Sequence, residues 1–168
     1  MPSDLTLEPV GRTLAIKGCF YLLIGVGAVP LVHALAGDDD APSSGSMAAA
    51  IAIFAVACIS LDLRSWLPLR PDLPRPPADA TVDEMRLNPR WYLALLSTAV
   101  YVAIFIGATE LLAELTDLTR TLVPGFLLGT AIAHLTGAFI VRLWQTRHHR
   151  KVVVGHEGTD KPRLFAAD

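Results

Sequence analysis

One apolar stretch decides the fold of this chain: "TLVPGFLLGTAIAHLTGAFIV", residues 121–141. It contains no Asp, Glu, Lys or Arg, and His134 is its one ionisable side chain. A helix that crosses a membrane needs about 20 consecutive, mostly apolar residues. We therefore expect this stretch to form a membrane-spanning helix.

Three more apolar blocks lack the same four charged residue types, at 18–37, 41–61 and 91–109. Hydrophobic residues make up 52% of the chain, and its mean hydropathy is +0.46. No block alternates with a period of two, the pattern of membrane β-strands. The sequence predicts an all-α integral membrane protein with four transmembrane helices in an antiparallel bundle. The expected membrane domain is 13–145, with helices at about 13–36, 44–67, 90–114 and 121–145.

The basic residues predict the orientation of the bundle. Of the fourteen Lys and Arg residues, all but Arg120 fall on one expected side of the membrane. Because cytoplasmic segments are enriched in Lys and Arg, both termini are expected in the cytoplasm and the protein in the cell (inner) membrane. An alternative interpretation treats 1–36 as a cleaved signal peptide that ends in "ALA" at 34–36. Cleavage there would leave three helices.

Three segments are expected outside the membrane: a short N-terminal segment (1–12), an inner loop (68–89) and a basic, loosely ordered tail (146–168). The loop is interpreted as a stiff, extended spacer, with partner docking as the alternative. Thr81 and Glu84 have the spacing of a capping box, which predicts a short surface helix. The loop contains six prolines: Pro68, Pro71, Pro74, Pro76, Pro77 and Pro89.

Two features concern how the helices associate. Small residues repeat every fourth position in the last helix, and such a stripe favours close helix contacts, within the bundle or with another chain. Matched spacings between the two halves of the chain are compatible with a tandem two-helix repeat. The stripe consists of Gly125, Gly129, Ala133 and Gly137, and the matched pairs are Arg12 with Arg90, Arg64 with Arg142, and Trp66 with Trp144.

His134 is the first candidate for a functional residue. An ionisable side chain in the membrane is costly to leave unpaired and often has a function. It is interpreted either as a structural histidine that is hydrogen-bonded to a Ser or Thr on a neighbouring helix, or as a haem ligand, a quinone contact or a member of a proton relay. No cofactor is otherwise predicted. One haem iron is not expected to join His134 to His33, because the two lie at different depths along their helices.

Two further pairs of ionisable residues are expected at the helix ends. His33 and Glu110 lie at similar depth near the outer surface, where a histidine and a carboxylate together bind a proton or a metal. The alternative is that both are water-exposed rim residues. Asp62 is expected to pair with Arg142 or Lys17 at the inner end, and a role of Asp62 in transport is the second interpretation.

Contacts with lipid head groups are predicted for Arg147, Arg150 and Lys151, since basic residues beside a membrane helix attract anionic lipids. Cys19 and Cys58 are interpreted as free thiols in the membrane, and no spacing of ligands predicts a metal site. The chain carries no nucleotide-binding or protease motif, and we expect no nucleic acid partner.

These observations favour an accessory or scaffold subunit of a larger membrane complex, which acts through helix association with other membrane chains or with itself. Its partners would be the lipid bilayer and those chains, and the composition resembles that of a GC-rich bacterial genome. The alternative is a homo-oligomeric small transporter or channel that uses His33, Glu110, His134 and Asp62. The second alternative is a membrane subunit that binds haem or quinone.

Overall fold

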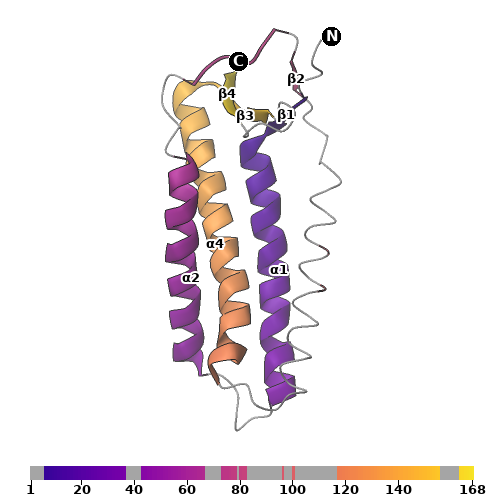
Figure 1. Ribbon diagram of the computed structural model, residues 1–168, viewed down its shortest axis with the longest axis vertical. Helices are drawn as coiled ribbons and strands as arrows, with labels where there is room; N and C mark the ends of the chain where they lie inside the picture. Colours follow the sequence, from indigo (N-terminus) through magenta and orange to yellow (C-terminus); the bar gives the residue numbers. More distant parts are fainter. Residues whose placement is uncertain are drawn as a thin grey trace.

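The computed structural model describes three helices and one small sheet (Figure 1). The helices are α1 (Val10–Ala36), α2 (Ser44–Trp66) and α4 (Asp117–His148). The strands are β1 (Thr6–Pro9), β2 (Thr81–Val82), β3 (Lys151–Gly155) and β4 (Arg163–Ala167). The described residues are 6–36, 43–66, 73–78, 80–82, 96, 100, 117–155 and 163–168.

The prediction of an all-α, four-helix bundle is wrong. Two of the described helices, α1 and α4, are long and apolar enough to cross a membrane, whereas α2 contributes a shorter apolar stretch, Ser44–Ser60. Segments that were expected to be loop or tail form a four-stranded sheet instead. The predicted helix at 90–114 lies outside the described residues except for 96 and 100. The two long apolar helices indicate a membrane protein.

Helix α4 lies between the other two and packs against both (Figure 1). Its contact with α2 is very close because α4 presents glycines there. A Cβ on Gly125 would lie 2.7 Å from the Cβ of Ala50. A Cβ on Gly129 would lie 2.6 Å from the Cβ of Phe54 and 2.7 Å from the backbone nitrogen of Ala55. Gly125 and Gly129 of the small-residue stripe therefore pack within this chain, against α2.

The contact between α1 and α4 uses the opposite arrangement. Here the glycines belong to α1, and the leucines of α4 lie against them. A Cβ on Gly18 would meet Leu135 Cγ at 2.7 Å, and one on Gly25 would meet Leu128 Cδ2 at 2.8 Å. Lipid offers no hydrophobic drive for helix association, so such close approach is the main source of stability between membrane helices.

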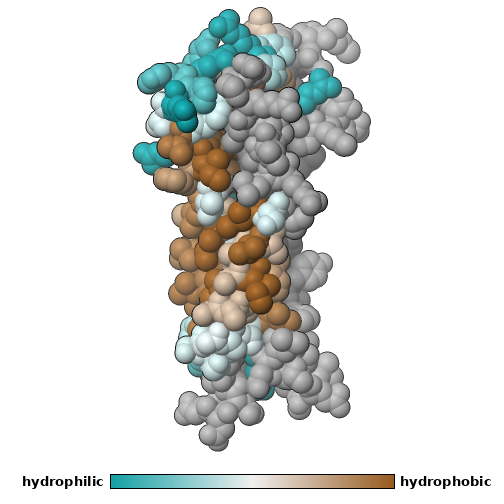
Figure 2. All heavy atoms as spheres, turned by 90° about the vertical axis from the view of Figure 1, so that its left-hand side faces the viewer, coloured by the Kyte–Doolittle hydropathy of each residue, from teal (hydrophilic) through white to brown (hydrophobic). Residues whose placement is uncertain are grey.

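The outward faces of the helices are apolar. Figure 2 shows an apolar band along the helices between two more hydrophilic ends, the stronger of which lies at the sheet. Side chains of this kind are stable against lipid but costly in water. The most exposed large hydrophobic side chains on the three helices are Leu23 (73%), Ile53 (67%), Phe139 (66%) and Val56 (65%).

The sheet joins the two ends of the described chain. Its strand order is β2-β1-β3-β4, with β1 and β2 parallel and the other pairs antiparallel. Glu8 of β1 is opposite Val154 of β3, and Val153 of β3 is opposite Phe165 of β4. Residues 151–155 and 163–167, which were expected to be loosely ordered, thus pair with each other and with the N-terminal segment.

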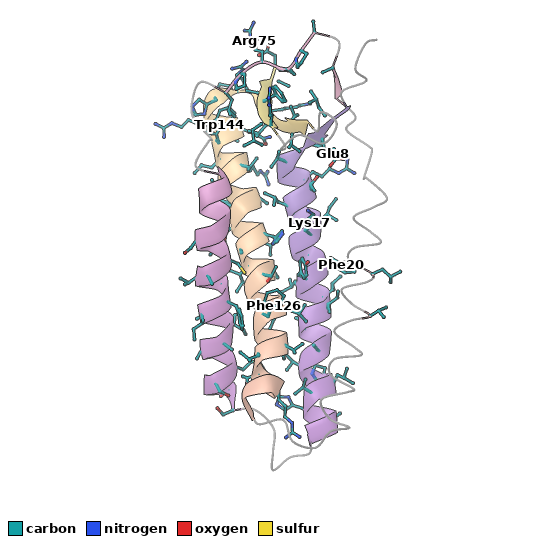
Figure 3. All side chains as sticks on the ribbon, viewed as in Figure 1. Glu8, Lys17, Phe20, Arg75, Phe126 and Trp144 are labelled. Atoms are coloured by element: carbon teal, nitrogen blue, oxygen red, sulfur yellow. The ribbon has the colours of Figure 1, made fainter. Side chains whose placement is uncertain are left out.

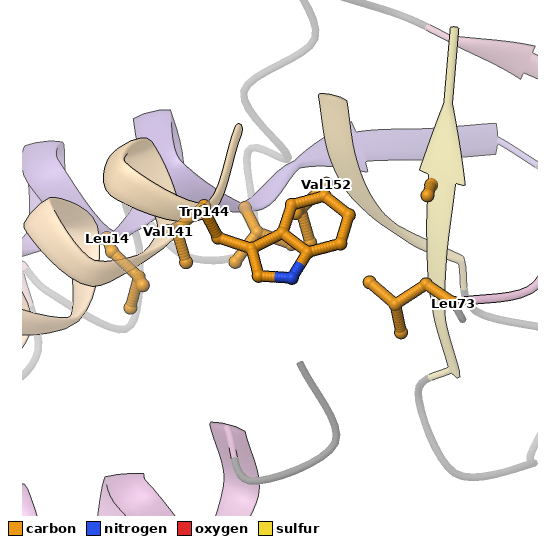
Figure 4. Close-up of a cluster of buried hydrophobic side chains, with 7 residues drawn as sticks. Leu14, Leu73, Val141, Trp144 and Val152 are labelled. Carbon is orange, nitrogen blue, oxygen red and sulfur yellow. The ribbon is translucent and has the colours of Figure 1, made fainter. Parts of the chain in front are cut away.

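Both faces of the sheet are buried. Successive side chains of a strand point to opposite faces. On the face toward the helices, Val152 and Ala166 pack with Trp144 and Val141 of α4 in one hydrophobic cluster (Figure 4). On the other face Leu7, Val153 and Ala167 form a second cluster with Ala80 and Phe165. Trp144, near the end of α4, is 8% exposed inside the first cluster.

Part of the proline-rich loop holds the edges of the sheet. The backbone nitrogen of Ala166 in β4 donates a hydrogen bond of 2.9 Å to the carbonyl of Pro74. A proline cannot donate but its carbonyl accepts, so it suits the edge of a sheet. At the opposite edge, Thr81 and Val82 pair with β1 instead of starting the expected helix. Residues 73–74 and 80–82 therefore contact the sheet, and this part of the loop is not a free spacer.

Candidate functional site

His134 lies half-buried on α4 and contacts α1. Its Nδ1–H donates a hydrogen bond to the carbonyl oxygen of Thr130, 2.9 Å away and one turn earlier in the same helix. Its ring centroid is 5.5 Å from that of Tyr21 on α1. Because a carbonyl oxygen only accepts, the proton of the neutral ring is on Nδ1, and Nε2 is the acceptor nitrogen. The expected hydroxyl partner is replaced by a backbone carbonyl.

His33 is exposed near the end of α1 and makes a similar local bond. Its Nδ1–H donates to the carbonyl oxygen of Val29 at 3.0 Å. Glu110 lies outside the described residues, as does the side chain of Asp62. The pairing of His33 with Glu110 and the ion pair of Asp62 therefore stay predictions.

The three residues predicted to contact lipid head groups have different surroundings. Arg147 is exposed on the last turn of α4. Arg150 is held on the sheet, because its guanidinium donates to an Asp168 carboxylate oxygen at 3.2 Å and to the carbonyl of Ala166 at 3.2 Å. Lys151 is exposed at the start of β3 and lines a pocket.

This pocket is a concave site on the described part of the chain. Its volume is about 580 Å³, and it lies where α1 begins, α4 ends and β3 starts. Ligand pockets in proteins have volumes of about 300–1,000 Å³, so this one is large enough for a ligand. The lining residues are Pro9, Gly11, Arg12 and Ala15 from the start of the chain, Ala138, Phe139, Arg142 and Gln145 from α4, and Lys151 and Val153 from β3.

The pocket is basic at one end and apolar at the other. Among the described residues, the charged ones that line it are Arg12, Arg142 and Lys151. Further along the helices, away from the sheet, the walls are formed by Ala15, Ala138 and Phe139. The pocket therefore suits a ligand with an anionic head and an apolar part. Lys17, also on α1, lies about two turns from the start of that helix (Figure 3).

This pocket is not predicted by the sequence. Arg12 and Arg142 indicate only the orientation of the helices in the membrane and the matched spacing of the two halves. Arg142 is also the expected partner of Asp62. The sequence does contain one signal, because both arginines are expected at the same inner end of their helices. The position of β3, which brings Lys151 to the same place, is not visible in the sequence.

The described part of the chain contains no group of three or more His, Cys, Asp or Glu side chains that could hold a metal ion. Cys19 is exposed on α1, and Cys58 is half-buried on α2, where its sulfur lies 3.7 Å from the hydroxyl oxygen of Thr130. The buried indole N–H of Trp144 has no hydrogen-bond partner within the described ranges. The chain matches no protein family model, no curated protein and no solved structure.

Proposed function

We propose that this chain is a multi-pass protein of a bacterial cell (inner) membrane, with both termini and the sheet in the cytoplasm. The pairing of β1 with β3 supports a common side for the two ends, because these strands lie at opposite ends of the chain and meet in one sheet. The abundance of Lys and Arg at this end supports the cytoplasmic side.

Within that membrane we propose the role of an accessory or scaffold subunit, which associates with other membrane chains or with itself. One observation carries this proposal: the apolar faces of α1, α2 and α4 are extensive and point outward. By contrast, His33 and His134 bind carbonyl groups of their own helices. In the described part of the chain, the outward faces of the helices are therefore better suited to a function than a pathway between the helices.

One observation favours a second function, the binding of haem or quinone. Donation of the Nδ1 proton of His134 to a backbone carbonyl makes Nε2 the nitrogen that is free of a proton. Histidines that ligate metals commonly have their other ring nitrogen bound in this way. A single ligand from His134 would then suffice for contact with such a group.

The test is native mass spectrometry of untagged protein, extracted in mild detergent from its own cells, with an absorption spectrum of the same sample. A defined hetero-complex is the expected result and would name the partner chain. A homo-oligomer without a chromophore would leave self-association but contradict a role in a complex with other chains, and it would favour transport. A haem or quinone spectrum that is lost in His134→Ala would support the second function.

A further inference from the structure

We propose that the pocket between α1, α4 and β3 binds the phosphate head of an anionic glycerophospholipid from the cytoplasmic leaflet. The inference rests on the proposed membrane orientation, but not on the accessory role. The pocket joins the cytoplasmic sheet to the two helices that are long enough to span a membrane. Its basic end therefore lies at the level where lipid phosphates are found.

Charge complementarity indicates that the head group of the ligand is anionic. The three charged lining residues, Arg12, Arg142 and Lys151, are all cations and come from three different elements. Arginine donates two parallel hydrogen bonds to phosphate oxygens, and lysine adds a compact positive charge. The Gln145 amide adds a further donor at the same end. Basic pockets between membrane helices on the cytoplasmic side bind anionic lipid heads by this chemistry.

The order of the lining residues along the helices indicates where the lipid tail would lie. On α1 the lining changes from Arg12 to Ala15 with increasing distance from the sheet. On α4 it changes in the same direction from Arg142 to Phe139 and Ala138. Both walls thus place the cations toward the cytoplasm and the apolar groups toward the membrane interior. A free phosphate would use only the basic end, whereas a phospholipid fits both.

Arg142 is the best residue to change. Arg12 and Lys151 each take part in a further interaction in the structure, so their replacement would alter more than the pocket. Arg163 of β4 is the control, because it is an exposed arginine that does not line the pocket and is not among the predicted lipid contacts. Arg142→Lys keeps the positive charge and separates loss of charge from loss of folding.

The experiment is a lipid titration of delipidated protein in a neutral detergent, followed by native mass spectrometry. We expect phosphatidylglycerol to bind more tightly than phosphatidylcholine with the same acyl chains. Arg142→Gln should weaken phosphatidylglycerol binding about fivefold, the effect of one basic residue near an anionic surface. Arg163→Gln should leave it within a factor of two, and Arg142→Lys should retain most of it.

Three results would overturn the proposal. Equal binding of the two lipids would exclude recognition of the anionic head. Equal weakening by Arg142→Gln and Arg163→Gln would indicate a diffuse effect of charge instead of a pocket. Full competition by inorganic phosphate or glycerol phosphate at matched concentration would identify a soluble anion as the ligand. Because this titration uses the isolated protein, its outcome is independent of whether a partner chain is found in cells.

Discussion

The helices and the sheet are stabilised by different physical effects. Between α4 and its neighbours, glycines allow the backbones to approach until a single added methyl group would collide. In the sheet, by contrast, branched side chains such as Leu7 and Val153 are fully buried. In a bilayer, close packing replaces the hydrophobic drive, whereas the sheet lies outside the apolar spans and gains stability from burial. Loss of a large apolar side chain should therefore matter most in the sheet, and gain of a methyl group should matter most between the helices.

The largest expected effect is the removal of a buried side chain from the sheet. Leu7→Ala should lower the free energy of unfolding by about 2–5 kcal/mol, because it leaves a cavity at a residue that is 0% exposed. Leu23→Ala, on α1 at 73% exposure, should change it by less than about 0.5 kcal/mol. Thermal unfolding in detergent compares the two variants. Equal losses would show that Leu7 is not buried as described.

The next effect concerns the contact between α2 and α4. Gly129→Ala should destabilise the protein by about 1–3 kcal/mol, because the new methyl group meets backbone atoms of α2 that cannot move aside easily. Gly27 on α1 is a matched control with no atom within 4 Å of an added Cβ. Gly27→Ala should stabilise the helix by about 0.5–1 kcal/mol. The same unfolding assay measures both, and effects of the same sign would refute the proposed packing.

A smaller effect on stability distinguishes His134 from His33. His134→Ala should cost about 1 kcal/mol, since it removes an aromatic contact with Tyr21 as well as packing at a half-buried position. His33→Ala should cost less than about 0.5 kcal/mol, because His33 is exposed and bonds only within α1. Denaturation of each variant in parallel provides the measurement. A larger loss at His33 would point to a partner outside the described residues, such as Glu110.

The smallest expected effect is that of the ion pair at the edge of the sheet. Arg150→Ala should lower stability by at most about 1 kcal/mol, because Asp168 is 74% exposed and solvent screens the pair. The loss should shrink further in 1 M salt. Arg147→Ala should have no measurable effect. A loss well above 1 kcal/mol, unchanged by salt, would show that the hydrogen bond to Ala166 dominates the role of Arg150.

The sequence predicted the helices better than the sheet for a physical reason. A membrane helix satisfies its own backbone, so a local apolar run such as 121–141 is enough to predict it. The strands are only two to five residues long and pair over nearly the whole chain. Their signals, such as "VVV" at 152–154, were too short to stand out beside the apolar blocks. Pairing partners so far apart are not visible in any local window.

The candidate sites show the same limit. The depth and type of His134 were visible in the sequence, but the acceptor of its hydrogen bond was not, because its ring can reach either a carbonyl one turn earlier in its own helix or a group on a neighbouring helix. The spacing of Gly125 and Gly129 predicted close packing, yet not that α2 would be the partner. The basic pocket needed the position of β3, and with it the whole sheet, to be known.

The most direct test of this account asks whether the two ends of the chain meet in one sheet. Glu8→Cys and Val154→Cys would be combined in a chain whose Cys19 and Cys58 are replaced by Ala, since Glu8 and Val154 are opposite each other in β1 and β3. Mild oxidation in native membranes should give an intramolecular disulfide, seen as a mobility shift without reductant. The control pair Glu8→Cys with Arg147→Cys should give little. Equal cross-linking of both pairs, or none in either, would contradict the sheet.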